Sequence, residues 1–100
     1  MHLVQLLLPV ADNAGHAFPR HMYADLAHRL TARFGGVTAY TRNAAEGYWG
    51  SKTQRRDDMY VMEVMTEGLD HAWWSSFRET LEQQFKQDKI VIRASIVELI

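Results

Sequence analysis

The feature of this sequence that most restricts its fold is the order of two kinds of apolar periodicity. Apolar residues spaced three and four apart, typical of amphipathic helices, occupy 19–34 and 70–85. Alternating or continuous apolar runs, typical of strands, occupy 2–9, 37–42, 59–66 and 89–99. The chain of 100 residues therefore predicts the order strand, helix, strand, strand, helix, strand.

Local signals mark the ends of both predicted helices. Pro19 suits the first position of a helix, where no N–H donor is needed. Gly35 suits the left-handed conformation that often ends a helix. Asp70 is a good N-cap for the second helix, and Leu69 and Trp74 have the spacing of a hydrophobic staple. Each signal falls where the periodicity changes, which supports the element order.

Two β-α-β halves joined by a β-β hairpin are typical of the ferredoxin-like plait. We therefore predict an α+β fold, with a four-stranded antiparallel sheet and two helices on one face. The strand order in space is then 4-1-3-2. The length suits one domain, so residues 1–100 are predicted to form a single ferredoxin-like domain.

The helices cover only one face of such a sheet, and alternation divides the strand residues between its faces. The covered face is predicted to carry Val4, Leu6, Leu8, Tyr60, Met62, Val64, Ile90, Ile92, Ala94 and Ile96. The open face is predicted to carry Leu3, Gln5, Leu7, Thr38, Tyr40, Arg42, Met59, Val61, Glu63, Met65, Val91, Arg93, Ser95 and Val97.

The open face is more apolar than a solvated sheet face usually is. At roughly 1.5–3 kcal/mol for each large apolar side chain, covering it is worth on the order of 10 kcal/mol. We therefore expect a homo-oligomer, most simply a homodimer in which a second copy covers this face. The alternative is that single exposed apolar residues are normal.

A row of polar side chains crosses the same face. In the plait order, Glu63, Gln5 and Arg93 lie on neighbouring strands, with Tyr40 and Arg42 beside them. Because a buried charge needs a partner, we expect Glu63 to pair with Arg93 or Arg42. One interpretation is an ion pair that sets the register of the strands or an interface. The other is a small-ligand site, with Glu63 and Tyr40 as candidate catalytic residues and the others binding the ligand.

A long polar segment, 43–56, separates the second and third predicted strands. It carries Tyr48 and Trp49, and long loops with aromatic groups often act as lids or contact arms. We expect these two residues to pack or dock against a neighbouring surface. They are also candidate ligand-binding residues if a small molecule binds under this loop.

Charge and composition exclude several classes of function. The formal net charge is −1, without the basic excess of most nucleic-acid-binding proteins, so we expect no nucleic-acid partner. The chain has no cysteine, which excludes disulfides and thiol chemistry. The five histidines have no metal-binding spacing, and we expect no metal and no cofactor. The apolar start, 1–9, is too short to span a membrane, so we expect a cytoplasmic protein without a membrane partner.

The whole chain resembles small bacterial proteins of uncharacterised function with this element order. The resemblance is carried by Arg33-Phe34-Gly35-Gly36-Val37-Thr38-Ala39-Tyr40, followed by Gly47-Tyr48-Trp49. It implies the fold and no particular activity.

Three families are similar in shape. Gly36-Val37-Thr38 and the long loop resemble the corresponding parts of the PII signalling family. This resemblance implies that the chain is a signalling or sensor protein. The segment Gly15-His16-Ala17-Phe18-Pro19-Arg20 and Asn43 resemble a loop and an asparagine of the acylphosphatases. In that family the loop amides and the arginine hold a phosphate. In dimeric α/β-barrel monooxygenases and isomerases, the open sheet face is the active cavity.

Three functions stay open at this point. The first is an oligomeric domain that binds a small ligand on its open sheet face or under 43–56. The second is a small enzyme of the dimeric barrel type, with Glu63 as base and arginines holding an anionic substrate. The third is a PII-like sensor.

Overall fold

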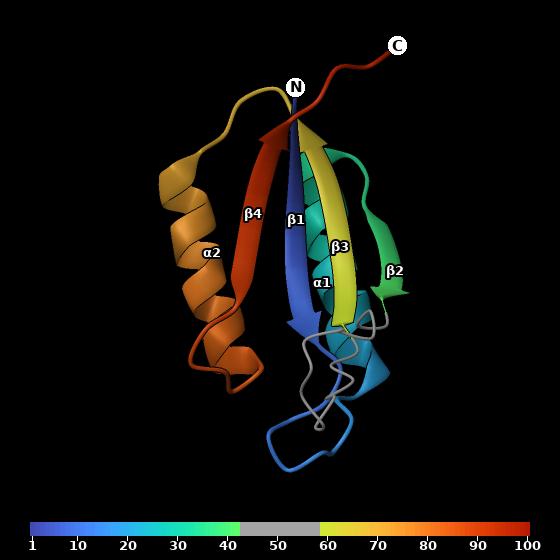
Figure 1. Cartoon of the computed structure of the whole chain (residues 1–100), viewed down its shortest axis with the longest axis vertical. Coiled ribbons are helices and arrows are strands. Elements are labelled where there is room, and N and C mark those ends of the chain that lie inside the picture. Colours follow the sequence, from blue (N-terminus) through green and yellow to red (C-terminus); the bar gives the residue numbers. More distant parts are fainter. Residues whose placement is uncertain (43–58) are drawn as a thin grey trace, which may run out of the picture.

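The computed structural model describes residues 1–42 and 59–100 and has the predicted element order (Figure 1). The elements are β1 (His2–Pro9), α1 (Arg20–Phe34), β2 (Thr38–Arg42), β3 (Met59–Thr66), α2 (His71–Gln84) and β4 (Val91–Ile96). The strands pair antiparallel in the order β2-β3-β1-β4. This is the predicted order read from the other edge, so the predicted α+β ferredoxin-like plait is confirmed.

The core lies between one face of the sheet and the two helices, and Figure 1 shows α1 behind the strands. The two central strands, β1 and β3, supply much of it, because every second side chain points toward the helices. Its most buried members are Phe85, Leu6, Leu8, Leu30, Met62, Leu81, Val4 and Val64. The helices thus hold the central strands from behind and leave the other face of the sheet open.

The helix boundaries follow the predicted capping residues to within one position. Gly35 has a φ of 85°, and its N–H donates to the Thr31 carbonyl at 2.8 Å, as the predicted left-handed cap requires. The Asp70 carboxylate accepts the N–H of Trp73 at 3.0 Å. Pro19 lies at the N-cap rather than at the first helical position, with a φ of −60° that suits either place.

One tyrosine joins α1 to the end of the first strand. Tyr23 is 8% exposed, its hydroxyl donates to the Pro9 carbonyl, and its ring stacks on Tyr60 with centroids 4.4 Å apart. Burial, with a smaller contribution from the neighbouring Tyr60 hydroxyl, raises the pKa of Tyr23 above its ordinary value. The fold therefore favours the neutral phenol at this contact.

Three strand residues differ from the predicted division into a covered and an open face. One is Ala94 on the edge strand β4, which was assigned to the covered face and is exposed. Ile96 was assigned to the covered face, yet it is 82% exposed, because β4 is an edge strand and the helices do not reach its end. Val61 lies on the open face, yet it is only 2% exposed. Alternation fixes the face toward which a side chain points, and it does not fix whether that face is covered at each position.

Candidate functional site

A chain of hydrogen bonds crosses the open face of the sheet, with one residue from each strand. The hydroxyl of Tyr40 on β2 donates to Oε2 of Glu63 on β3 at 3.1 Å. The Nε2 of Gln5 on β1 donates to the same oxygen at 2.6 Å. The Nε of Arg93 on β4 donates to Oε1 of Gln5 at 2.9 Å. We call Tyr40, Glu63, Gln5 and Arg93 the polar row.

The strand register explains how the polar row forms. Tyr40 is paired with Val61 and reaches Glu63 diagonally, whereas the other three residues are directly aligned. Gln5 is paired directly with Glu63 on one side and with Arg93 on the other. Directly opposed side chains of an antiparallel pair share a face and lie close together. The sequence predicted this neighbourhood from alternation and strand order.

The predicted partner of Glu63 was wrong in one respect. Glu63 makes no ion pair with Arg93 in the part of the chain that the structure describes. β1 lies between β3 and β4, so these two residues are two strand spacings apart, roughly 10 Å. The Gln5 amide fills that distance, accepting from the guanidinium and donating to the carboxylate. The alternative pairing with Arg42 involves a side chain outside the described residues.

The two oxygens of the Glu63 carboxylate differ in their hydrogen bonds. The carboxylate is half-buried, and both of its hydrogen bonds to described residues, from Gln5 and Tyr40, end on Oε2. Its other oxygen, Oε1, has no hydrogen-bond partner among residues 1–42 and 59–100. An ionised carboxylate has about four acceptor positions, so Glu63 retains capacity to accept donors from a bound molecule.

A groove of about 470 Å³ opens beside Glu63 on this face. It forms because the chain leaves α1 at Gly35 and enters β2 only at Thr38, the residue paired with Glu63. Met65 on β3 therefore has no β2 neighbour, and the space beside it is left open. The groove is lined by Leu3, Phe34, Gly35, Gly36, Val37, Thr38, Glu63 and Met65.

Among residues 1–42 and 59–100, Glu63 is the single charged residue that lines the groove, and none of the described lining residues is basic. The walls are apolar side chains, the Thr38 hydroxyl and the backbone around two glycines. Small-ligand sites commonly combine apolar walls with a few convergent polar groups. The described lining thus combines apolar side chains with one hydrogen-bond acceptor that carries a negative charge.

The first loop, which resembles the phosphate-holding loop of acylphosphatases, is occupied by its own carboxylate. The N–H groups of Ala14 and His16 donate to Oδ1 of Asp12 at 2.9 Å and 2.8 Å. These bonds, chiefly that from His16, hold the pKa of Asp12 below its ordinary value. Two amides of this loop therefore already serve an anion, and Pro19 has no N–H to add.

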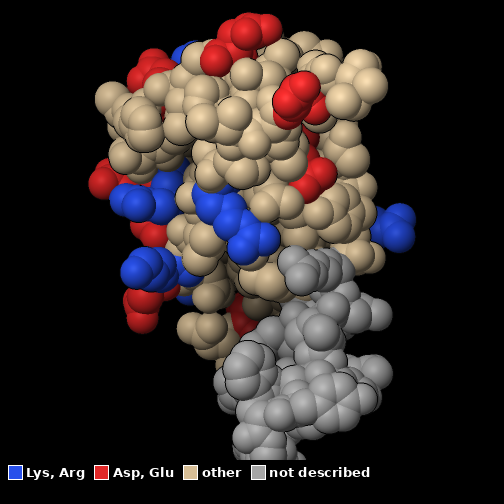
Figure 2. Space-filling model, turned by 45° about the horizontal axis from the view of Figure 1, so that its top comes forward, with Lys and Arg blue, Asp and Glu red and all other residues tan. Residues whose placement is uncertain are grey.

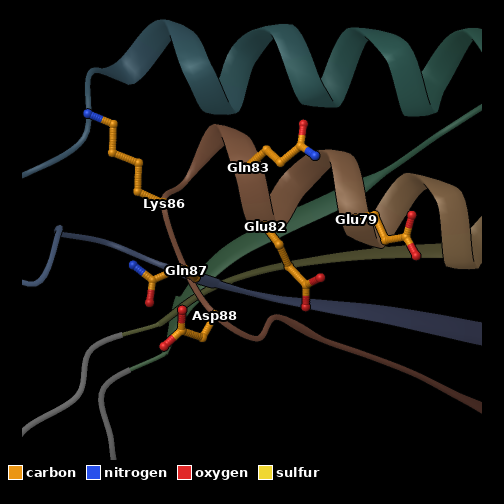
Figure 3. A pocket seen from close by; sticks show the side chains of 6 residues that line it. All are labelled: Glu79, Glu82, Gln83, Lys86, Gln87 and Asp88. Carbon is orange, nitrogen blue, oxygen red and sulfur yellow. The ribbon is translucent and has the colours of Figure 1, made fainter.

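A second hollow lies at the end of α2, and Figure 3 shows the side chains around it. It is lined by Glu79, Glu82, Gln83, Lys86, Gln87 and Asp88. Oε2 of Glu82 accepts the N–H of Ile90 at 2.9 Å. This carboxylate thus has a structural role: it ties the start of β4 to α2.

Charged groups of both signs are interspersed on the face in Figure 2, and no broad basic patch is visible there. Among the described residues, no group of three His, Asp or Glu side chains is placed to hold a metal ion. In the same ranges, no helix combines the length and apolarity needed to cross a membrane. Of the predicted site residues, Tyr48 and Trp49 lie outside the described residues.

Sequence reasoning missed the groove itself. It treated Gly35 and Gly36 only as a helix end, and it treated Leu3 and Met65 only as part of an apolar face. The available signal was the two-residue delay between that helix end and the first paired residue of β2, Thr38.

The sequence matches no protein-family model, and no curated protein matches it. Its fold is similar to that of a solved structure, a phage SAM lyase in complex with S-methyl-5′-thioadenosine. The superposition has a TM-score of 0.58 and covers 94% of this chain and 79% of that one, with 12% sequence identity. At this identity the similarity concerns the fold alone.

Proposed function

We propose that this protein binds a small, uncharged or cationic ligand in the groove beside Glu63. The observation that carries the proposal is the Glu63 carboxylate, which lines the groove and whose Oε1 has no hydrogen-bond partner among the described residues. The other described residues of the lining are apolar side chains, Thr38 and two glycines. The carboxylate is held from behind by Gln5 and Tyr40, so it is already oriented when a ligand arrives.

The composition of the groove indicates the class of ligand. Among the described residues no Lys or Arg lines it, so a phosphate would meet the carboxylate without a compensating cation from that part of the chain. A nucleoside offers the complementary set, since its ribose diol donates hydrogen bonds and its base packs on apolar side chains such as Leu3 and Met65. The ligand of the phage SAM lyase, S-methyl-5′-thioadenosine, is such a molecule and carries no phosphate.

The test is calorimetric titration of the protein with S-methyl-5′-thioadenosine, SAM and AMP as probes. We expect the first two to bind and AMP to bind more weakly, because of its phosphate. Glu63→Gln removes the charge-assisted acceptor and should weaken binding by about 10- to 150-fold. Glu67→Gln is the matched control, because Glu67 is exposed, lies just beyond β3 and does not line the groove. Equal binding by wild type and Glu63→Gln would contradict the proposal.

A second candidate function is catalysis in the same groove. The observation that favours it is the contact between the Tyr40 hydroxyl and Glu63, which joins a phenol and a carboxylate at 3.1 Å. In this case Glu63 acts as a general base toward the bound ligand. Incubating each bound probe with the protein and following products by chromatography separates the two functions. Tyr40→Phe should slow turnover while retaining most of the binding.

The homodimer through the open face stays a prediction. Tyr40, Val91 and Met65 are 40%, 46% and 49% exposed there, so some apolar surface is available to a second copy. Met65→Glu places a charge on that surface and should weaken such a contact. Sedimentation velocity measures the effect, and an unchanged association constant would contradict an open-face interface.

A further inference from the structure

In the part of the chain that the structure describes, the outer edge of β4 pairs with no strand, and most residues of β4 are apolar. In the described sheet β4 pairs only with β1, so one side of its backbone is without a strand neighbour. Its sequence, Val-Ile-Arg-Ala-Ser-Ile, contains one charge and no proline or lysine. Natural edge strands usually carry charged residues, lysine above all, or proline, because these residues prevent pairing with another chain. The outer edge of β4, which faces away from β1 in Figure 1, therefore suits pairing with a further strand.

A groove of about 140 Å³ runs along the same edge, between α2 and β4. Apolar residues from the sheet and the helix form much of its lining, among them Val4, Trp74 and Ile92. Ile96 points to the same face of the sheet as Ile92 but lies beyond the helix, 82% exposed. The rest of the lining includes the polar residues His71, Ser75, Arg78 and Arg93. An exposed isoleucine and a partly apolar groove thus occupy the same face of one edge strand.

We propose that β4 pairs antiparallel with β4 of a second copy of this chain, about a two-fold axis at Ala94. The two sheets then form one continuous eight-stranded sheet with all helices on one side. The contact is isologous, so the same residues face one another from both copies. It involves the edge of the sheet, goes beyond the proposed ligand function and does not depend on it.

The register follows from geometry and charge. A two-fold axis perpendicular to the sheet pairs residues that share a face, so it must pass through a residue position. For the strand Val91–Ile96, only axes at Arg93 and Ala94 pair five residues of each copy, since other positions pair three or fewer. An axis at Arg93 opposes two arginines, which is unfavourable. An axis at Ala94 opposes Arg93 with Ser95 and Ile92 with Ile96.

The Ala94 register also accounts for the exposed isoleucine. It places Ile96 of each copy directly opposite Ile92 of the other, at the mouth of the groove between α2 and β4. Two exposed isoleucines are then covered at once, and each groove receives an apolar side chain. The unpaired backbone groups of both edges gain partners in the same step.

The first test is sedimentation velocity over a micromolar concentration series. We expect the wild-type chain to self-associate, and Ile96→Glu to reduce association at least tenfold, because it brings a charge to the paired strand. Leu99→Glu is the matched control, since Leu99 is also exposed, at 61%, but lies outside β4. A monomeric wild type, or equal effects of both substitutions, would overturn the proposal.

The second test reads the register directly. Ser95→Arg places an arginine opposite Arg93 twice in each dimer and should weaken association about 2- to 30-fold, whereas Ser95→Glu should strengthen it by a similar factor. Because the chain has no cysteine, Ala94→Cys gives a single thiol on the axis. It should form an intermolecular disulfide much faster than Leu99→Cys. The difference should persist in a Met65→Glu background, in which the open-face contact is expected to be weakened. Similar effects of both Ser95 variants, or equal crosslinking rates, would overturn the register.

Discussion

The Gln5 amide is the central link of the polar row, and Gln5→Met removes it with little change in side-chain length. The substitution deletes one hydrogen bond to the half-buried Glu63 carboxylate and one from the exposed Arg93 guanidinium. A hydrogen bond to a charged group contributes about 1.5 kcal/mol or more, and a surface contact at most about 1 kcal/mol. The thioether regains under about 1 kcal/mol by apolar burial at this half-buried position.

The expected net loss of unfolding free energy is about 1–2 kcal/mol, or a fall in Tm of about 4–16 °C for a domain of this size. Urea denaturation followed by tryptophan fluorescence measures it, because Trp74 is buried in the core at 7% exposure. Gln84→Met, on the exposed surface of α2, is the control for residue type and should be neutral. A loss below about 0.5 kcal/mol would refute the view that the polar row holds the strands together.

Three further predictions concern the fold that supports the site. Gly35→Ala should cost about 1 kcal/mol because of the φ of 85°, whereas Gly36→Ala, which has no left-handed φ and open space around its Cβ, should be neutral or slightly stabilising in the same denaturation assay. Asp70→Ala should cost about 0.5–2 kcal/mol through loss of the N-cap bond, and Asp70→Asn should restore most of it. Burial and Tyr60 raise the pKa of Tyr23 above 10.0. Its contribution to the free energy of unfolding should therefore be complete below pH 10 and be lost as the pH rises through the raised pKa. Tyr23→Phe should remove this alkaline dependence in a pH series of unfolding free energies.

The fold was predictable because several signals agreed at each boundary. The left-handed glycine at 35 and the N-cap at Asp70 appear in the structure where the sequence placed them. All four strands lie within their predicted ranges, although the last is shorter, Val91–Ile96 instead of 89–99. The alignment of Gln5 with Glu63 and Arg93 followed from the strand order together with alternation. Short-range rules and one topological rule were therefore sufficient for the backbone and for the neighbours within the polar row.

The remaining features depend on distances that periodicity does not contain. The predicted ion pair of Glu63 with Arg93 was wrong because a whole strand lies between them, so a neutral amide connects the two charges. Ile96 is exposed because the helix ends before the strand does, a matter of relative length. The groove beside Glu63 arises from the point at which β2 begins to pair, which is a property of the assembled sheet.

Arg93 connects the two surfaces for which functions are proposed. Its Nε donates to Gln5, which donates in turn to Glu63, so it belongs to the support of the ligand groove. In the Ala94 register it also lies opposite Ser95 of the second copy. A change in the position of Arg93 on pairing alters the polarisation of the Gln5 amide and therefore the strength of Glu63 as an acceptor.

Thermodynamic linkage then requires reciprocity: the factor by which pairing of two chains changes ligand affinity equals the factor by which the ligand changes the affinity of the two chains for each other. Comparing ligand affinity between the wild type and Ile96→Glu measures that factor without any change in the groove.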